Sequence, residues 1–120
     1  MHPSDPLTVE VRRHRRTALV TLSGELDLVT ISQVADTVEA LDPTGDGVRH
    51  IVLDLRDLTF MDLAGLRELL RQNDDARTNH HNLAFVRGPA AIDRVLTLTN
   101  TAELLVLVDH PDDLVPPVAH

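Results

Sequence analysis

The stretch Leu58-Thr59-Phe60-Met61-Asp62-Leu63-Ala64-Gly65-Leu66 decides the fold. The residues just before it, 51–55, are apolar and begin with β-branched side chains, which predicts a strand. Leu66 and Leu69 then follow at helical spacing, and Asp62 is placed to cap that helix. A helix that begins directly after a strand directs unpaired backbone N–H groups at one point of the surface, where an anion or a partner's acceptor is favoured. The sequence therefore predicts a functional surface at this junction.

The remaining segments alternate between strand and helix patterns. First we expect a strand from Leu7 with one solvent-exposed face, a basic turn, and a strand over residues 17–22 that is covered on both faces. A helix over 30–41, a strand over 49–55 and a helix to about Thr78 follow. The chain then continues with a strand over 83–86, a helix after Gly88-Pro89 and a last strand over 104–108. A hairpin followed by alternating helices and strands gives a mostly parallel sheet with one antiparallel edge strand. We therefore predict an α/β domain over residues 7–108, with helices packed against the sheet, a flexible N-terminus over 1–6 and a flexible acidic tail over 109–120.

The composition limits the classes of function. The chain has no cysteine, which excludes disulfides and thiolate metal sites. Its net charge is -8, and the one basic run, residues 12–16, lies between two strand patterns. We interpret this run as a solvated turn, with contact to an anion as the alternative, and expect no nucleic-acid binding. No segment approaches the ~18–20 apolar residues that membrane insertion needs, so we expect a cytoplasmic protein.

Side chains with catalytic or metal-binding chemistry lack the spacing that such sites require. His80 and His81 are neighbours and have no further ligand at a suitable distance along the chain. Asp54, Asp57 and Asp62 would have to converge in a dry pocket to act as acid and base, and we assign the last two to a turn and a helix cap. No serine lies in a nucleophile pattern, and the glycines form no phosphate loop. We predict no catalytic residue, no cofactor and no metal.

Several apolar residues surround the predicted helix start, namely Phe60, Met61, Leu63 and Leu66. Two interpretations are open. All of them pack against the sheet, or Met61 and Leu63 form a protein-binding patch beside acidic residues, which is typical of contact surfaces. We favour the second interpretation.

The chain resembles the STAS domain of bacterial anti-sigma factor antagonists. The residues that carry the resemblance are Gly24-Glu25-Leu26-Asp27, His50-Ile51-Val52-Leu53-Asp54-Leu55, Leu58-Thr59-Phe60-Met61-Asp62 with Gly65-Leu66, and Pro89-Ala90-Ala91-Ile92-Asp93-Arg94-Val95-Leu96 with Thr99-Asn100-Thr101. The resemblance implies a STAS-like mixed sheet. It also implies binding to an anti-sigma factor, often a serine kinase of the histidine-kinase-like ATPase fold, with release of a sigma factor. In that family, phosphorylation of a serine at the start of the helix breaks the complex.

The sequence departs from this family at the phospho-acceptor position. The family pattern Asp-Ser/Thr-Ser-Gly-Leu reads Asp62-Leu63-Ala64-Gly65-Leu66 here, so Ala64 stands in the place of the acceptor and has no hydroxyl. Thr59, the nearest hydroxyl, lies before the helix. Either Ala64 makes a permanently active antagonist, or the bulky Leu63 has changed the partner.

We therefore predict a non-enzymatic regulatory protein that binds an anti-sigma factor or a related regulator. The predicted partner-binding residues are Asp27, Met61, Asp62, Leu63, Ala64, Gly65 and Leu66. The alternative is a STAS scaffold or a subunit of a stress-signalling or lipid-transport complex. The oligomeric state stays open.

Overall fold

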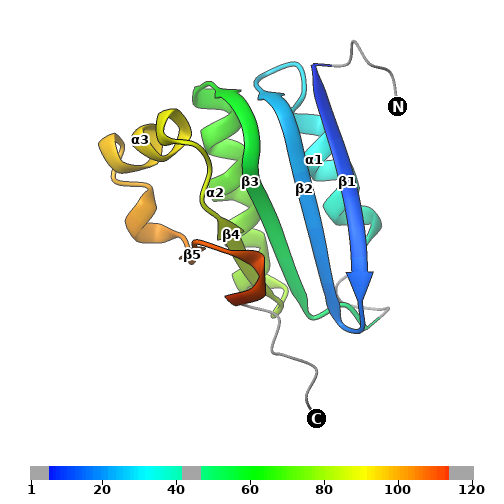
Figure 1. The fold of residues 1–120 in the computed structure, drawn as a ribbon. Helices are drawn as coiled ribbons and strands as arrows, with labels where there is room; N and C mark the ends of the chain where they lie inside the picture. The colour runs from blue at the N-terminus through cyan, green and yellow to red at the C-terminus, as the bar shows by residue number, and fades with distance from the viewer. Residues whose placement is uncertain (1–5, 42–46, 114–120) are drawn as a thin grey trace.

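The structure is a computed structural model that describes residues 6–41 and 47–113. The described residues form one five-stranded sheet with three α-helices and two short 3-10 helices (Figure 1). The elements are β1 (Leu7–His14), β2 (Thr17–Leu26), α1 (Ile31–Ala40), β3 (His50–Met61), α2 (Leu63–Thr78), β4 (Asn82–Val86), α3 (Ala90–Leu98), η1 (Ala102–Leu104), β5 (Leu107–Val108) and η2 (Pro111–Asp113).

The strands follow one another across the sheet in the order β1-β2-β3-β4-β5. β1 is antiparallel to β2, and every other pair is parallel, which confirms the predicted α/β fold with an antiparallel edge strand. α1 and α2 lie behind the sheet in the view of Figure 1. β2 and β3 pair from Thr17↔His50 to Leu26↔Met61, so both strands end at the same edge and the loops that follow them are neighbours.

The core is mainly aliphatic, with Phe85 as its aromatic member, and lies between the sheet and the helices. Ala18, Val20 and Leu22 of β2 are buried, whereas Thr17, Leu19 and Thr21 between them are only half-buried. The expectation that β2 is covered on both faces is therefore wrong. Strand side chains point alternately to the two faces, and the face opposite the buried set is partly open. The core cluster contains, among others, Ile51, Leu53, Leu55, Leu69, Phe85, Ile92 and Leu96.

Two strand boundaries differ from the prediction. β3 continues six residues beyond the predicted end at Leu55, because residues up to Met61 still pair with β2. The last strand contains only Leu107 and Val108, since residues 102–104 form η1 instead. The helix predicted to end near Thr78 does so.

The first described residue of the chain is tied to the end of β2. The backbone N–H of Glu25 donates to the carbonyl oxygen of Pro6 at 2.8 Å. Gly24 has a φ of 109° there, and a Cβ at this position would lie 2.1 Å from the same oxygen, so only glycine fits.

The predicted flexible segments, residues 1–6 and 109–120, lie largely outside the described residues, and their flexibility stays a prediction. Where the structure describes this part of the chain, Asp109 forms an ion pair with Arg87 at 3.1 Å, and residues 111–113 form η2.

Candidate functional site

The helix start at the end of β3 has the predicted cap. Asp62 has an extended backbone, and its Oδ1 accepts a hydrogen bond from the Gly65 N–H at 2.9 Å. The Asp62 carbonyl oxygen accepts the first helical bond, from the Leu66 N–H at 3.0 Å. The carboxylate also meets the positive end of the helix dipole. Asp62 therefore fixes where α2 begins.

The same carboxylate joins the loop after β2 to the helix start. Its Oδ2 accepts from the Leu28 N–H at 3.4 Å, and the Asp62 N–H donates to the Leu26 carbonyl oxygen at 3.3 Å. Within the loop after β2, Asp27 Oδ1 accepts from the backbone N–H groups of Val29 and Thr30 at 3.0 and 3.2 Å. The two acidic residues thus hold the two neighbouring loops in place, and they lie at one end of the molecule as expected.

Gly65 lets α2 approach the end of β2 closely. A Cβ on this residue would lie 2.4 Å from the Leu26 carbonyl oxygen and 2.9 Å from Cγ of Met61. The spacing from Asp62 to Gly65 therefore has a double physical basis, a cap from Asp62 and a close backbone contact at Gly65.

Large apolar side chains are exposed around the ends of β2 and β3: Leu28 and Val29 lie in the loop after β2, Phe60 lies near the end of β3, and Leu63 is the first residue of α2. Leu28 is 72% exposed, Val29 81%, Phe60 49% and Leu63 58%, and they make up half of the eight exposed large apolar residues of the described chain. Together with Asp27 and Asp62 we call these four side chains the loop surface. Exposed apolar groups beside charged ones are typical of protein contact surfaces.

The structure corrects the predicted composition of this surface. Met61 and Leu66 are only 6% and 4% exposed, and Gly65 is also buried. Met61 is the last residue of β3 and its Cγ lies beneath Gly65, so it supports the surface from below. Leu63 is exposed and Ala64 is half-buried.

Sequence reasoning missed Leu28 and Val29. The sequence feature that could have indicated them is a pair of consecutive apolar residues between Asp27 and the apolar stripe of the helix, which begins at Ile31. An apolar pair that precedes a helix outside its buried stripe has no core position available.

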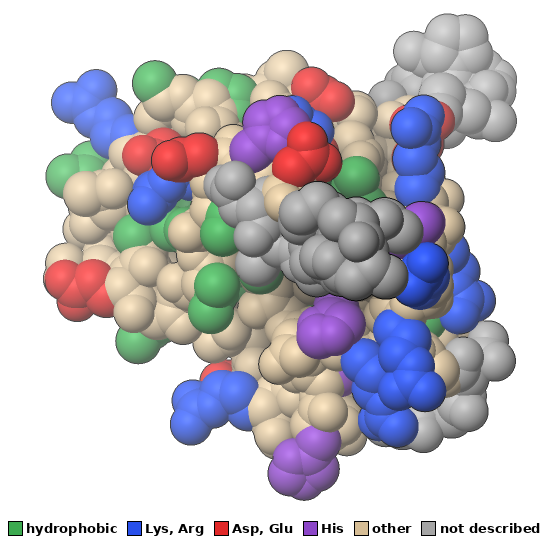
Figure 2. All heavy atoms as spheres, turned by 60° about the horizontal axis from the view of Figure 1, so that its bottom comes forward, with side chains coloured by type: hydrophobic (Ala, Val, Ile, Leu, Met, Phe, Trp, Pro, Cys, Tyr) green, Lys and Arg blue, Asp and Glu red, His purple; other side chains and the backbone are tan. Residues whose placement is uncertain are grey.

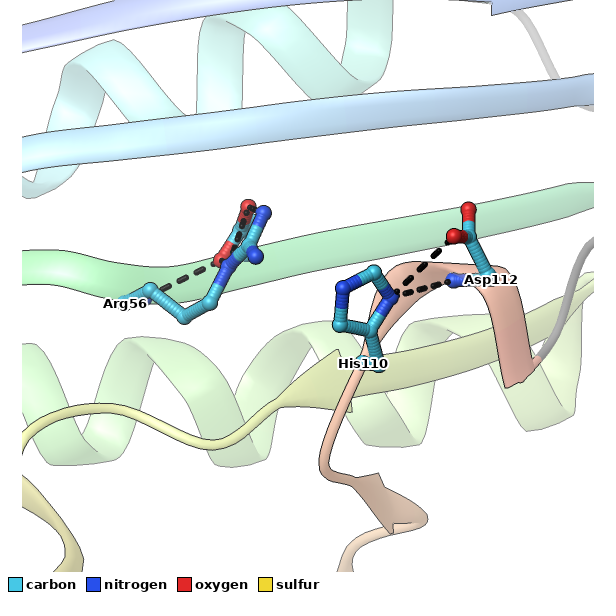
Figure 3. A network of polar contacts seen from close by, with 4 residues as sticks. Arg56, His110 and Asp112 are labelled. Carbon is cyan, nitrogen blue, oxygen red and sulfur yellow. Dashed lines mark hydrogen bonds and ion pairs between the residues drawn. The ribbon is translucent and has the colours of Figure 1, made fainter.

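The other acidic candidates do not converge on one pocket. Asp54 is buried and binds Arg56 through Nε at 3.0 Å and through a terminal guanidinium nitrogen at 2.8 Å, whereas Asp57 is exposed. These bonds to Asp54 raise the pKa of Arg56 above its ordinary value. Figure 3 shows Arg56 on β3, with His110 and Asp112 on the C-terminal segment. His110 Nδ1 lies 3.3 Å from a carboxylate oxygen of Asp112.

The histidine pair also stays apart from any cluster of ligands. In the residues that the structure describes, no group of three or more histidine or acidic side chains is arranged to hold a metal ion. His81 is half-buried, burial lowers its pKa, and its Nδ1 has no hydrogen-bond partner among the described residues. Within the same residues, no helix is both long and apolar enough to cross a membrane.

Comparisons with known proteins agree with this architecture. The family model described as "Mlab, STAS domain" matches residues 9–109. The chain is 28% identical over 104 residues to an anti-sigma F factor antagonist of Paenibacillus polymyxa, covering 87% of this chain and 88% of that one. It is also 28% identical over 82 residues to osmosensory protein A of Mycobacterium tuberculosis, covering 68% of this chain but only 50% of that protein.

A solved structure has the same fold. An anti-sigma factor antagonist from Mycobacterium paratuberculosis superposes with a TM-score of 0.78 at 24% identity, covering 94% of each chain. Together with the family match over nearly the whole chain, this similarity confirms the predicted fold and shows that the chain belongs to the STAS domain family.

Proposed function

We propose that this protein is an anti-sigma factor antagonist that binds an anti-sigma factor through the loop surface. The observation that carries the proposal is the exposure of Leu28, Val29, Phe60 and Leu63 around the ends of β2 and β3, where Asp62 bonds both the loop after β2 and the start of α2. The similarity to the Paenibacillus polymyxa antagonist over 87% of the chain supports the same assignment.

The chemistry of the loop surface suggests what the partner offers. Apolar side chains at the centre of a contact lose water on binding, which contributes about 25 cal/mol for each Å² of apolar surface buried. Asp27 and Asp62 at the edge favour a partner with basic residues around an apolar patch, since complementary charge sets orientation and the rate of encounter. We infer an anti-sigma factor, or a serine kinase of the histidine-kinase-like ATPase fold, with such a patch.

The proposed complex lacks the phosphorylation switch of the family. Ala64 occupies the second position of α2, between the exposed Leu63 and the buried Gly65. A phosphate at this position would add about 1.5–2 negative charges beside Asp62, which repels it. Because Ala64 cannot accept phosphate, we propose that the complex is governed by the amounts of the two proteins.

A binding assay with matched variants tests the loop surface. Leu63→Glu places a charge among apolar contacts, and we expect it to weaken binding to a purified anti-sigma factor at least ~30-fold, as for a central contact residue. Leu104→Glu is the control, because Leu104 is similarly exposed, at 63%, but lies away from Leu63. The Leu104 carbonyl oxygen accepts a hydrogen bond from Asn73, which is ten residues further along α2 than Leu63. Equal losses for both variants, or no loss for Leu63→Glu, would refute the assignment.

A phosphorylation assay tests the missing switch. Incubated with a serine kinase partner and ATP, the natural chain should take up no phosphate within residues 58–66. Ala64→Ser should be phosphorylated at residue 64 and then released from the kinase. Phosphate found on Thr59 of the natural chain would contradict the proposal.

A second candidate function is a scaffold or a subunit of a stress-signalling or lipid-transport complex. The similarity to half of osmosensory protein A favours it, because there the matching region is part of a larger protein. Capture of partners from the native cell separates the two candidates: an ATPase-fold regulator supports the antagonist, and transporter or stress-complex subunits support the scaffold. In either case we propose a non-catalytic, cytoplasmic binding module.

A further inference from the structure

A cleft of about 310 Å³ opens at the end of the sheet opposite the loop surface. Its lining comes from the first residues of three parallel strands, Thr17 of β2, His50 to Val52 of β3 and Asn82 to Ala84 of β4, together with Val106 before β5. Thr17, His50 and Asn82 are register partners, as are Val52 and Ala84. Because Ile51 and Leu83 belong to the core beneath the helices, strand alternation places Val52 and Ala84 on the opposite face of the sheet.

The cleft has an apolar floor and a polar end. Val52 and Ala84 form the floor beside the exposed Val106, and Thr17, His50 and Asn82 form the end. The Asn82 side-chain amide nitrogen lies 3.0 Å from His50 Nδ1. An amide NH₂ can only donate, so Nδ1 is the acceptor and the ring proton lies on Nε2. The polar end therefore offers hydrogen-bond donors from His50, Thr17 and Asn82.

Several arginines lie in the segments next to the polar end. Five of the eleven arginines of this acidic chain are concentrated in the β1–β2 hairpin and the residue before β3, namely Arg12, Arg13, Arg15, Arg16 and Arg49. The N–H groups of Arg49 and His50 both donate to the Arg16 carbonyl oxygen, at 2.8 and 3.0 Å, so two arginines adjoin the residues of the polar end. Figure 2, which turns this end of the molecule forward, shows a group of arginine side chains on the right with histidines beside it, and other arginines on the left. Clustered positive charge beside a concave site raises the local concentration of anions.

We propose that this cleft binds a small amphipathic carboxylate. The apolar tail lies over Val52 and Ala84, and the carboxylate accepts hydrogen bonds at His50 and Thr17 in the field of Arg16 and Arg49. The cleft volume suits a small ligand, and octanoate is the one we choose to test. A site of this size lies at the lower end of the range for small-molecule pockets.

An NMR titration of the full chain with sodium octanoate tests the proposal. Saturable shifts are expected at the backbone amides of His50, Val52, Ala84 and Val106, with none on the loop surface. Octan-1-ol has the same tail without the charge, and acetate has the charge without the tail, so each should bind at least ~10-fold more weakly. Equal affinity for octan-1-ol, or shifts spread over the loop surface, would overturn the proposal.

Two variants at the cleft and one elsewhere complete the test. Ala84→Leu fills the floor, and Arg49→Ala removes the charge of the residue that precedes His50. Each variant should weaken octanoate binding at least ~10-fold. Leu63→Ala, at the other end of the molecule, should bind octanoate unchanged. Arg49→Ala alters only an exposed side chain, so it decides the matter if Ala84→Leu folds poorly. Unchanged octanoate binding by Arg49→Ala overturns the proposal. Shifts of the same amide signals when only the protein concentration is raised also overturn it, because they would assign the cleft to a second copy of the chain.

Discussion

Replacing Gly65 with alanine sets two effects of known size against each other. Alanine in place of glycine within a helix normally stabilises it by about 1 kcal/mol. Here the new Cβ would lie 2.4 Å from the Leu26 carbonyl oxygen, where ordinary contacts begin at 3.4 Å, so the backbone must move by about 1 Å. Overpacking that shifts backbone costs up to about 3 kcal/mol. We therefore expect Gly65→Ala to destabilise the fold by about 2 kcal/mol.

Thermal unfolding measures this difference directly. The unfolding entropy of a 120-residue chain makes 1 kcal/mol equal to about 4 °C in Tm, so Gly65→Ala should lower Tm by about 8 °C. Ala64→Gly, one residue earlier in the same turn, is the control for helix propensity and should cost about 1 kcal/mol. If propensity alone operated, Gly65→Ala would gain what Ala64→Gly loses. A Tm for Gly65→Ala at or above that of the natural chain would refute the close-contact argument.

Two further predictions concern the cap and the half-buried His81. Asp62→Ala should lower the free energy of unfolding in urea by about 1 kcal/mol, because it removes the acceptor for the Gly65 N–H. Asp62→Ser keeps such an acceptor and should restore most of this loss. Equal losses for the two variants would exclude the cap as the cause. Burial holds the pKa of His81 below its ordinary 6.5, so the unfolded chain binds this proton more readily. The stability that neutral His81 contributes is then complete above pH 6.5 and is lost as the pH falls below this value. The free energy of urea unfolding of His81→Asn should therefore depend less on pH than that of the natural chain, between about pH 7.5 and about pH 5.

Most of the fold was accessible from the sequence because its patterns are local. The helix over Leu63–Thr78 has a cap, an apolar stripe and a clear end, and each of these signals depends on residues within one segment. The full length of β3 was not accessible in this way. Residues 56–61 alternate poorly, and they are held as a strand by pairing with β2, which lies more than thirty residues away along the chain.

The candidate site was predicted in position but only partly in composition. Asp62 and Leu63 could be placed from the cap and the helix period alone. Met61 was misassigned because its burial depends on Gly65, which brings α2 down onto the end of β2. Leu28 and Val29 lie in a loop that Asp27 holds locally and that Asp62 joins to the start of α2. No local pattern encodes the bond from Leu28 to Asp62.

The hydrogen bond between Pro6 and Glu25 has a practical consequence for any reagent made from this chain. Glu25 pairs with Phe60, so the polypeptide enters the domain next to the loop surface. An affinity tag or fluorescent protein fused ahead of Pro6 would stand beside the proposed contact and obstruct a partner by bulk alone. Immobilisation through the opposite pole, at the hairpin around Arg15, leaves the loops facing the solution.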